Sequence, residues 1–108
     1  EAVMADEVEV NGIRWRRGAE GRDARLVWTA TLGPATLTAR PFVRICNGRS
    51  DVWMVRLDCG EERRDEGDVH GSVGEAMAAA EPWALGLLRG WRNLGALAGQ
   101  ALVAAGGQ

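Results

Sequence analysis

The sequence predicts an α+β domain in which a four- to five-stranded antiparallel β-meander is packed by C-terminal helices. Three observations support this fold class. An Asn-Gly dipeptide joins two alternating runs near the N-terminus, further short alternating runs are separated by glycine and proline, and a long apolar segment follows them. Because the sheet would have one apolar face in need of cover, the C-terminal segment is predicted to supply the second layer.

The composition fits one ordinary globular domain over residues 1–108. Of these residues 46% are hydrophobic and 26% are charged, and the formal net charge is -2. A chain of this size supports a single modest core, and its acidic balance argues against a protein that coats a polyanion. All 13 basic residues are arginine, which we interpret as codon bias in a GC-rich genome.

The first predicted element is a β-hairpin over residues 7–16. Asn11 and Gly12 tolerate the positive φ angles of a type I′ turn. A two-residue loop gives one face that is apolar and another that carries opposite charges in pairs. The predicted partners are Val10 with Ile13, Glu9 with Arg14, Val8 with Trp15 and Glu7 with Arg16.

The remaining strands are predicted to complete a sheet over residues 7–58. Residues 26–32 and 35–39 alternate on either side of Gly33-Pro34 and form a second hairpin. Residues 42–45 continue the strand, and residues 52–57 form another with Trp53, Val55 and Leu57 on one side. Residues 59–71 are dense in charge without a clear period, so they predict a solvated loop.

The helical region is predicted over residues 72–105. Ser72 and Glu75 fit a capping box that starts a helix. Pro82 costs about 3 kcal/mol inside a helix, so we expect a break near residues 81–82 and two helical segments. The second segment is apolar at helical spacing, and it carries glycines about four apart that suit close helix packing.

No pattern indicates catalysis, a cofactor or a metal site. Cys46 and Cys59 are the only cysteines and His70 is the only histidine, which leaves too few ligands for structural zinc. His70 could act as a general base beside Asp68 or Asp65, but no recognisable motif places a nucleophile near it. We therefore expect a protein that is not an enzyme and has two reduced thiols. Polar interruptions of the apolar segment predict no membrane span, and we expect a cytoplasmic location.

Three loose motifs carry a resemblance. They are Trp28-x-Ala30-x-x-Gly33, then Trp53-x-Val55 before a polar loop, then Gly71-Ser72-x-x-Glu75-Ala76 before an alanine-rich helix. In this order the chain resembles small uncharacterised proteins of bacteriophages, prophages and GC-rich bacteria, over roughly residues 25–88. The resemblance implies a β-meander followed by one helix and an origin in a mobile element. It implies no activity and no binding residue.

The favoured function is a protein-interaction module. The second helical segment has an apolar surface that is broad for one small sheet, so a homodimer through this segment is the simplest expectation. An accessory or inhibitor role toward an unidentified protein is a further form of the same hypothesis. The alternative is a monomer in which both segments fold back on the sheet. The expected interface residues are Trp83, Leu87, Trp91, Leu94, Leu97 and Ala98.

The second function class is DNA binding through the sheet. If Trp28, Leu37 and Trp53 face the helix, the opposite face presents threonine and arginine from the predicted strands. Some DNA-binding domains lay such a face into the major groove. The acidic net charge and the lack of an aromatic stacking pair make nucleic acid the less favoured partner. The candidate residues are Arg40, Arg44 and Arg56.

Overall fold

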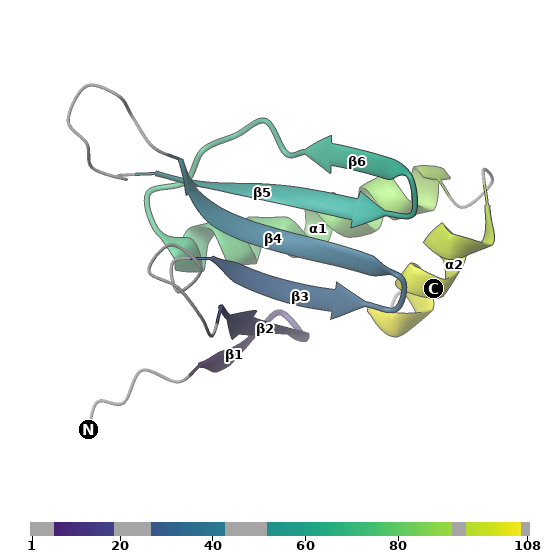
Figure 1. The fold of residues 1–108 in the computed structure, drawn as a ribbon, viewed down its shortest axis with the longest axis horizontal. Coiled ribbons are helices and arrows are strands. Elements are labelled where there is room, and N and C mark those ends of the chain that lie inside the picture. Colours follow the sequence, from purple (N-terminus) through teal and green to yellow (C-terminus); the bar gives the residue numbers. More distant parts are fainter. Residues whose placement is uncertain (1–5, 19–26, 43–51, 92–94, 107–108) are drawn as a thin grey trace.

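The computed structural model describes residues 6–18, 27–42, 52–91 and 95–106, which form one antiparallel sheet with two helices on one face (Figure 1). The strand order in the sheet follows the chain order, which confirms the predicted meander. The sheet has six strands among the described residues, one more than the upper limit of the prediction. The elements are β1 (Glu7–Val10), β2 (Ile13–Arg17), β3 (Trp28–Leu32), β4 (Ala35–Phe42), β5 (Val52–Cys59), β6 (Glu62–Asp65), α1 (Val73–Trp91) and α2 (Ala96–Ala104).

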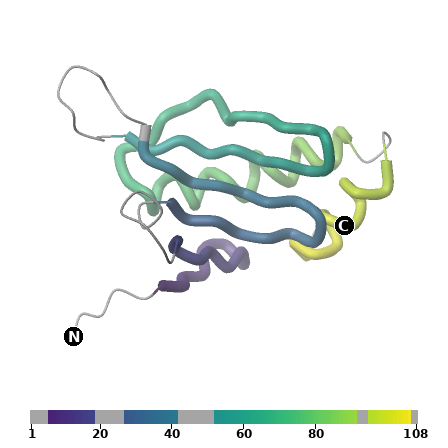
Figure 2. Tube along the Cα trace, in the orientation of Figure 1, coloured from purple at the N-terminus to yellow at the C-terminus, as the bar shows by residue number. Residues whose placement is uncertain are grey.

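The N-terminal hairpin has the predicted register. Val10 lies opposite Ile13 and Glu7 lies opposite Arg16, as the two-residue loop requires. Asn11 has a φ of 54° and Gly12 a φ of 83°, so both loop residues adopt the left-handed conformation of a type I′ turn. The trace in Figure 2 shows this hairpin at one side of the meander, next to β3.

The sixth strand corrects the prediction of a charged loop over residues 59–71. After a turn that begins at Gly60, whose φ is 63°, β6 pairs with β5. Asp65 lies opposite Arg56 with their side chains 3.0 Å apart, and Arg63 lies opposite Asp58 at 2.7 Å. A strand forms here because β5 offers the complementary charge at each position where β6 is charged on that face.

Helix α1 runs unbroken through Pro82, so the predicted break near residues 81–82 is wrong. A proline at this position removes the N–H that would bond the carbonyl of Ala78, four residues earlier. That carbonyl instead accepts a hydrogen bond of 3.2 Å from Nδ2 of Asn11, at the tip of the N-terminal hairpin. The hairpin thus supplies the missing donor, and α1 continues to Trp91.

The start of α1 is fixed by the predicted cap and by the sheet. The hydroxyl of Ser72 accepts a hydrogen bond from the Glu75 N–H at 3.1 Å, and Oε1 of Glu75 accepts one from the Gly71 N–H at 3.1 Å. Just before the cap, His70 pairs with Trp53 of β5 through two backbone hydrogen bonds of 2.8 and 2.9 Å. These contacts satisfy the Glu75 N–H in the first turn and the Gly71 N–H just before the cap, and they tie the helix to the sheet.

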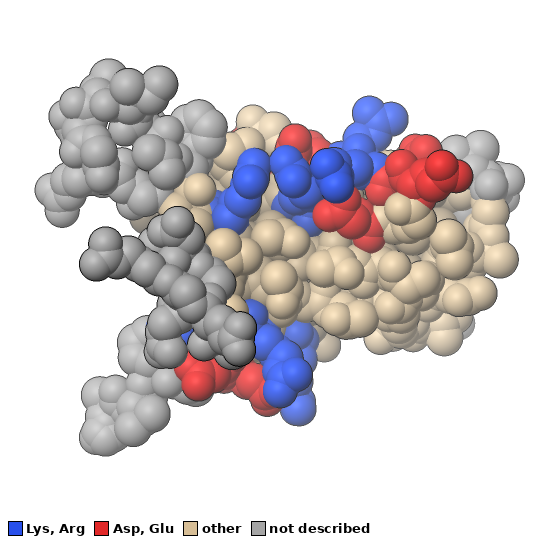
Figure 3. Space-filling model, in the orientation of Figure 1, with Lys and Arg blue, Asp and Glu red and all other residues tan. Residues whose placement is uncertain are grey.

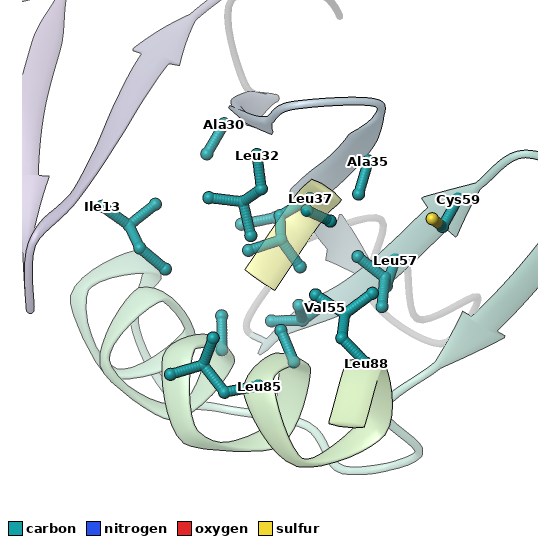
Figure 4. Packing of buried hydrophobic residues seen from close by; sticks show 14 of the residues in the cluster. Ile13, Ala30, Leu32, Ala35, Leu37, Val55, Leu57, Cys59, Leu85 and Leu88 are labelled. Carbon is teal, nitrogen blue, oxygen red and sulfur yellow. The ribbon is translucent and has the colours of Figure 1, made fainter. Parts of the chain in front are cut away.

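The core lies between the sheet and the two helices, with most of its helical residues from α1. Figure 4 shows Leu88 of α1 beside Leu57 and Val55 of β5, with the side chains of β3 and β4 above the helix. Trp28 and Leu37 face the helix as predicted, and Trp53 is partly buried at the margin. The largest fully buried side chains are Trp15, Leu37, Leu57, Leu88 and Val55.

Helix α2 packs against two of the hairpin turns. A Cβ atom at Gly33, in the β3–β4 turn, would lie 3.2 Å from the carbonyl oxygen of Gln100. A Cβ atom at Gly60, in the β5–β6 turn, would lie 2.7 Å from Cδ1 of Leu97. Glycine at both turns therefore allows α2 to approach closely. Both helices fold back on their own sheet.

Candidate interaction surface

The sheet face opposite the helices, here called the open face, carries many charges that pair with one another. On β1 and β2, Arg16 lies 2.8 Å from Glu7, and on β5 and β6 the open-face carboxylates of Asp58 and Asp65 are each bound by an arginine. Between these two charged bands, threonines of β3 face threonines of β4. Figure 3 shows this uncharged band between two bands of mixed charge. The opposed pairs are Thr29 with Thr38 and Thr31 with Thr36.

The DNA-binding hypothesis rests on an open face of arginine without carboxylates, and the observed face differs. Arg40 is exposed on β4, but Arg56 is bound to Asp65, and Asp58 adds a second carboxylate beside it. Arg44 lies outside the described residues. The prediction ended the strand at Leu57 and so left both carboxylates out. Mixed charge weakens the electrostatic attraction for phosphate that such a site needs.

The outer face of the helical layer differs because it has almost no charge. Across α1 and α2 the charged residues are Glu75, Glu81 and Arg89. A surface helix over a sheet normally carries polar side chains on the side away from the core. On α1 the exposed positions between Glu75 and Arg89 are instead Ala78, Pro82 and Gly86. This surface is therefore apolar where water would favour polar groups.

Five residues of α1 form a row along this face, here called the outer seam. The row follows spacings of four, three, four and three residues, which places its members on one side of a helix. Four of them are exposed, and Ala79 is partly buried. Trp83 and Leu87 lie beside the row and are only partly buried. The outer seam consists of Glu75, Ala79, Pro82, Gly86 and Arg89.

The predicted interface residues divide between core and surface. Trp91 and Ala98 are 8% and 5% exposed and belong to the core, so their prediction as interface residues is corrected. They are buried because α1 continues past Pro82 and α2 folds back on the hairpin turns. Leu97 is 44% exposed. Trp83 and Leu87 keep part of their surface in solvent, and Leu94 lies outside the described residues.

A pocket of about 230 Å³ lies where the β5–β6 turn meets the corner between the helices. Its apolar lining includes the thiol of Cys59, which is free, and burial raises the pKa of this thiol. The thiol therefore stays protonated at neutral pH and is a poor nucleophile. Cys46 lies outside the described residues. The described lining is Cys59, Glu61, Glu62, Trp91, Gly95, Leu97 and Ala98.

His70 has a carboxylate partner, but not one of those predicted. Its Nε2 lies 2.7 Å from Oε1 of Glu66, and the two side chains are 15% and 8% exposed. Asp65 binds Arg56 instead. The spacing of four residues between Glu66 and His70 is the sequence feature that could have indicated this pair. Since the backbone of His70 pairs with β5, the contact joins the end of β6 to the start of α1, which is a structural role.

Neither the side-chain chemistry of the described residues nor a comparison with known proteins assigns a function to this surface. Within the described ranges, no group of three or more histidine, cysteine, aspartate or glutamate side chains could hold a metal ion. Neither described helix combines the length and the apolar character that crossing a membrane would require. Searches against protein-family models, curated proteins and solved structures find no match.

Proposed function

We propose that this protein is a non-enzymatic protein-interaction module that forms a homodimer through the outer face of α1. The observation that carries the proposal is the uncharged row between Glu75 and Arg89. An apolar helix face in water favours association, because covering it removes its surface from solvent. Trp83 and Leu87, which are partly buried, lie beside that row and add to its apolar character.

Gly86 supports the same proposal. A glycine inside a helix costs about 1 kcal/mol relative to alanine. A Cβ atom at Gly86 would meet nothing within 4 Å, so no contact with the rest of the described chain accounts for the glycine. A second helix packed closely over this position would account for it, because small residues let helix backbones approach.

The expected affinity is modest. One pair of helices buries less than the roughly 800 Å² per partner of a standard interface. Association in the roughly micromolar range is therefore expected, driven by apolar burial. Dimer and monomer should then exchange over an accessible range of protein concentration.

Sedimentation velocity at increasing concentration tests the proposal. The wild type should shift from monomer to dimer, and Gly86→Glu should remain monomeric because it places a carboxylate and extra volume in the outer seam. The matched control is Thr31→Glu, which adds the same charge on the open face and should dimerise like wild type. A wild type that stays monomeric at its highest soluble concentration, or a Gly86→Glu variant that dimerises normally, would contradict the proposal.

A further inference from the structure

We infer that the outer seam binds the same seam of a second copy in antiparallel orientation, about a twofold axis at Pro82. This inference rests on the proposed function and specifies the partner surface and its direction. It follows from where α1 carries its charges. Glu75 and Arg89 each stand seven residues from Pro82, one toward either end of the helix.

The spacing makes the two copies complementary in only one direction. Seven residues of helix span about 10 Å, so Glu75 and Arg89 lie about 21 Å apart along α1. At that separation they are too far apart to pair with each other. In an antiparallel pair centred on Pro82, Glu75 of each copy faces Arg89 of the other. A parallel pair would place glutamate against glutamate and arginine against arginine, which is unfavourable.

The sizes of the residues fit the same arrangement. Pro82 would meet its counterpart at the axis, and Ala79, three residues from it, would lie within about one residue rise of Gly86 of the second copy, which is four residues from the axis. Small residues therefore lie near the centre, where two helices come closest, at an interaxial distance toward the short end of about 8–10 Å. The long side chains of Glu75 and Arg89 lie at the ends, where crossing helices diverge. The alternation of four and three residues is also the spacing of a coiled-coil contact row.

Both end residues have capacity for a partner. Oε1 of Glu75 accepts the Gly71 N–H, which holds the carboxylate at the start of α1 and leaves Oε2 for a second donor. Among the described residues Arg89 makes no ion pair, and it is exposed in the last turn of the helix. The twofold arrangement would form two such ion pairs, one at each end.

Charge reversal tests the orientation. Glu75→Arg and Arg89→Glu should each weaken homodimerisation about tenfold at low salt, because either change creates two like-charged contacts. The double variant Glu75→Arg/Arg89→Glu should recover most of the affinity. An equimolar mixture of the two single variants should form heterodimers in preference to homodimers, because both contacts are then complementary. Sedimentation equilibrium, with one variant carrying a fluorescent label, measures each species.

Controls separate orientation from folding. Glu75→Gln keeps an acceptor for the Gly71 N–H and removes only the charge, and Arg89→Gln is its counterpart. Each should weaken the dimer less than a reversal does, and far-ultraviolet circular dichroism checks that all variants are folded. Suppose that Gly86→Glu dissociates the dimer but the double variant Glu75→Arg/Arg89→Glu does not recover the affinity. That result would overturn the antiparallel pairing and leave the proposed function standing. A monomeric wild type would overturn both.

Discussion

The two faces of this molecule differ in how their charged side chains are arranged. On the open face, pairing of neighbouring strands brings arginine and carboxylate side chains to within 2.7 to 3.0 Å, as in Arg63 with Asp58 and Arg56 with Asp65. On the outer face of α1, Glu75 and Arg89 stand at opposite ends of an apolar row. Several charges of the open face are thus paired with neighbouring strands, whereas Glu75 and Arg89 are not paired with each other.

The contrast comes from geometry. An antiparallel ladder places opposed residues about 5 Å apart, so complementary strands neutralise each other locally. A single helix separates residues along its axis, and distant charges on it are screened by salt.

Replacing Leu88 by alanine tests whether the sheet and the helices share one core and unfold together. Leu88 is fully buried beside Leu57 and Val55, so Leu88→Ala should cost about 2–5 kcal/mol of unfolding free energy. Chemical denaturation followed by tryptophan fluorescence and by circular dichroism should show one common transition. Its neighbour Leu87, only partly buried, is the control, and Leu87→Ala should cost clearly less. Two separate transitions would show that sheet and helices unfold independently.

Gly33→Ala should have the next largest effect. Alanine is strained at the φ of +60° found at Gly33, and its Cβ would press on the carbonyl of Gln100 in α2. We expect the free energy of unfolding to fall by about 2 kcal/mol, partly because the new Cβ atom would displace α2. Gly12→Ala is the matched control, because Gly12 also has a positive φ but no atom within 4 Å of an added Cβ. Equal losses from the two changes would refute the contact with α2.

The bond from Asn11 to the Ala78 carbonyl can be tested by a double-mutant cycle. Asn11→Gly preserves the turn and removes the donor, so it should cost about 1 kcal/mol. In a Pro82→Ala background the new alanine amide can bond the same carbonyl. The cost of Asn11→Gly should then fall by at least half, measured by urea denaturation. Additive changes would mean that Asn11 does not compensate for Pro82.

The smallest effect is expected on the open face. Asp65→Asn removes one charge from a partly exposed pair with Arg56, so it should cost less than about 1 kcal/mol, and less at high salt. Dimerisation should be unchanged, because this pair lies on the face away from α1. A change in sedimentation comparable to that of Gly86→Glu would remove the distinction between the two faces.

Much of the sheet could be predicted because local chemistry fixed it. Asn11-Gly12 specifies its turn, and the flanking residues specify the same register, so sequence and structure agree residue by residue. The last hairpin follows the same rule of opposed charges through Arg56 with Asp65. It was missed because β6 has no apolar residue, and its alternation is visible only beside the charges of β5.

The helical layer was harder to predict because distant residues decide it. Pro82 predicts a break when α1 is considered alone, but Asn11, 67 residues from Ala78, supplies the missing donor. Once α1 continues, Trp91 enters the core and the candidate surface moves to the opposite side of the helix. The apolar character of the segment was readable from sequence. Which residues of it remain exposed depends on tertiary packing.

The central claim is most directly tested by the concentration dependence of unfolding. The urea midpoint of the wild type should rise with protein concentration, as it does for a dimer that dissociates on unfolding. The midpoint of Gly86→Glu should not depend on concentration, and in dilute solution it should equal or exceed that of the wild type, because glutamate favours a helix more than glycine does. A wild-type midpoint independent of concentration, or the same dependence in Gly86→Glu, would contradict an interface on the outer seam.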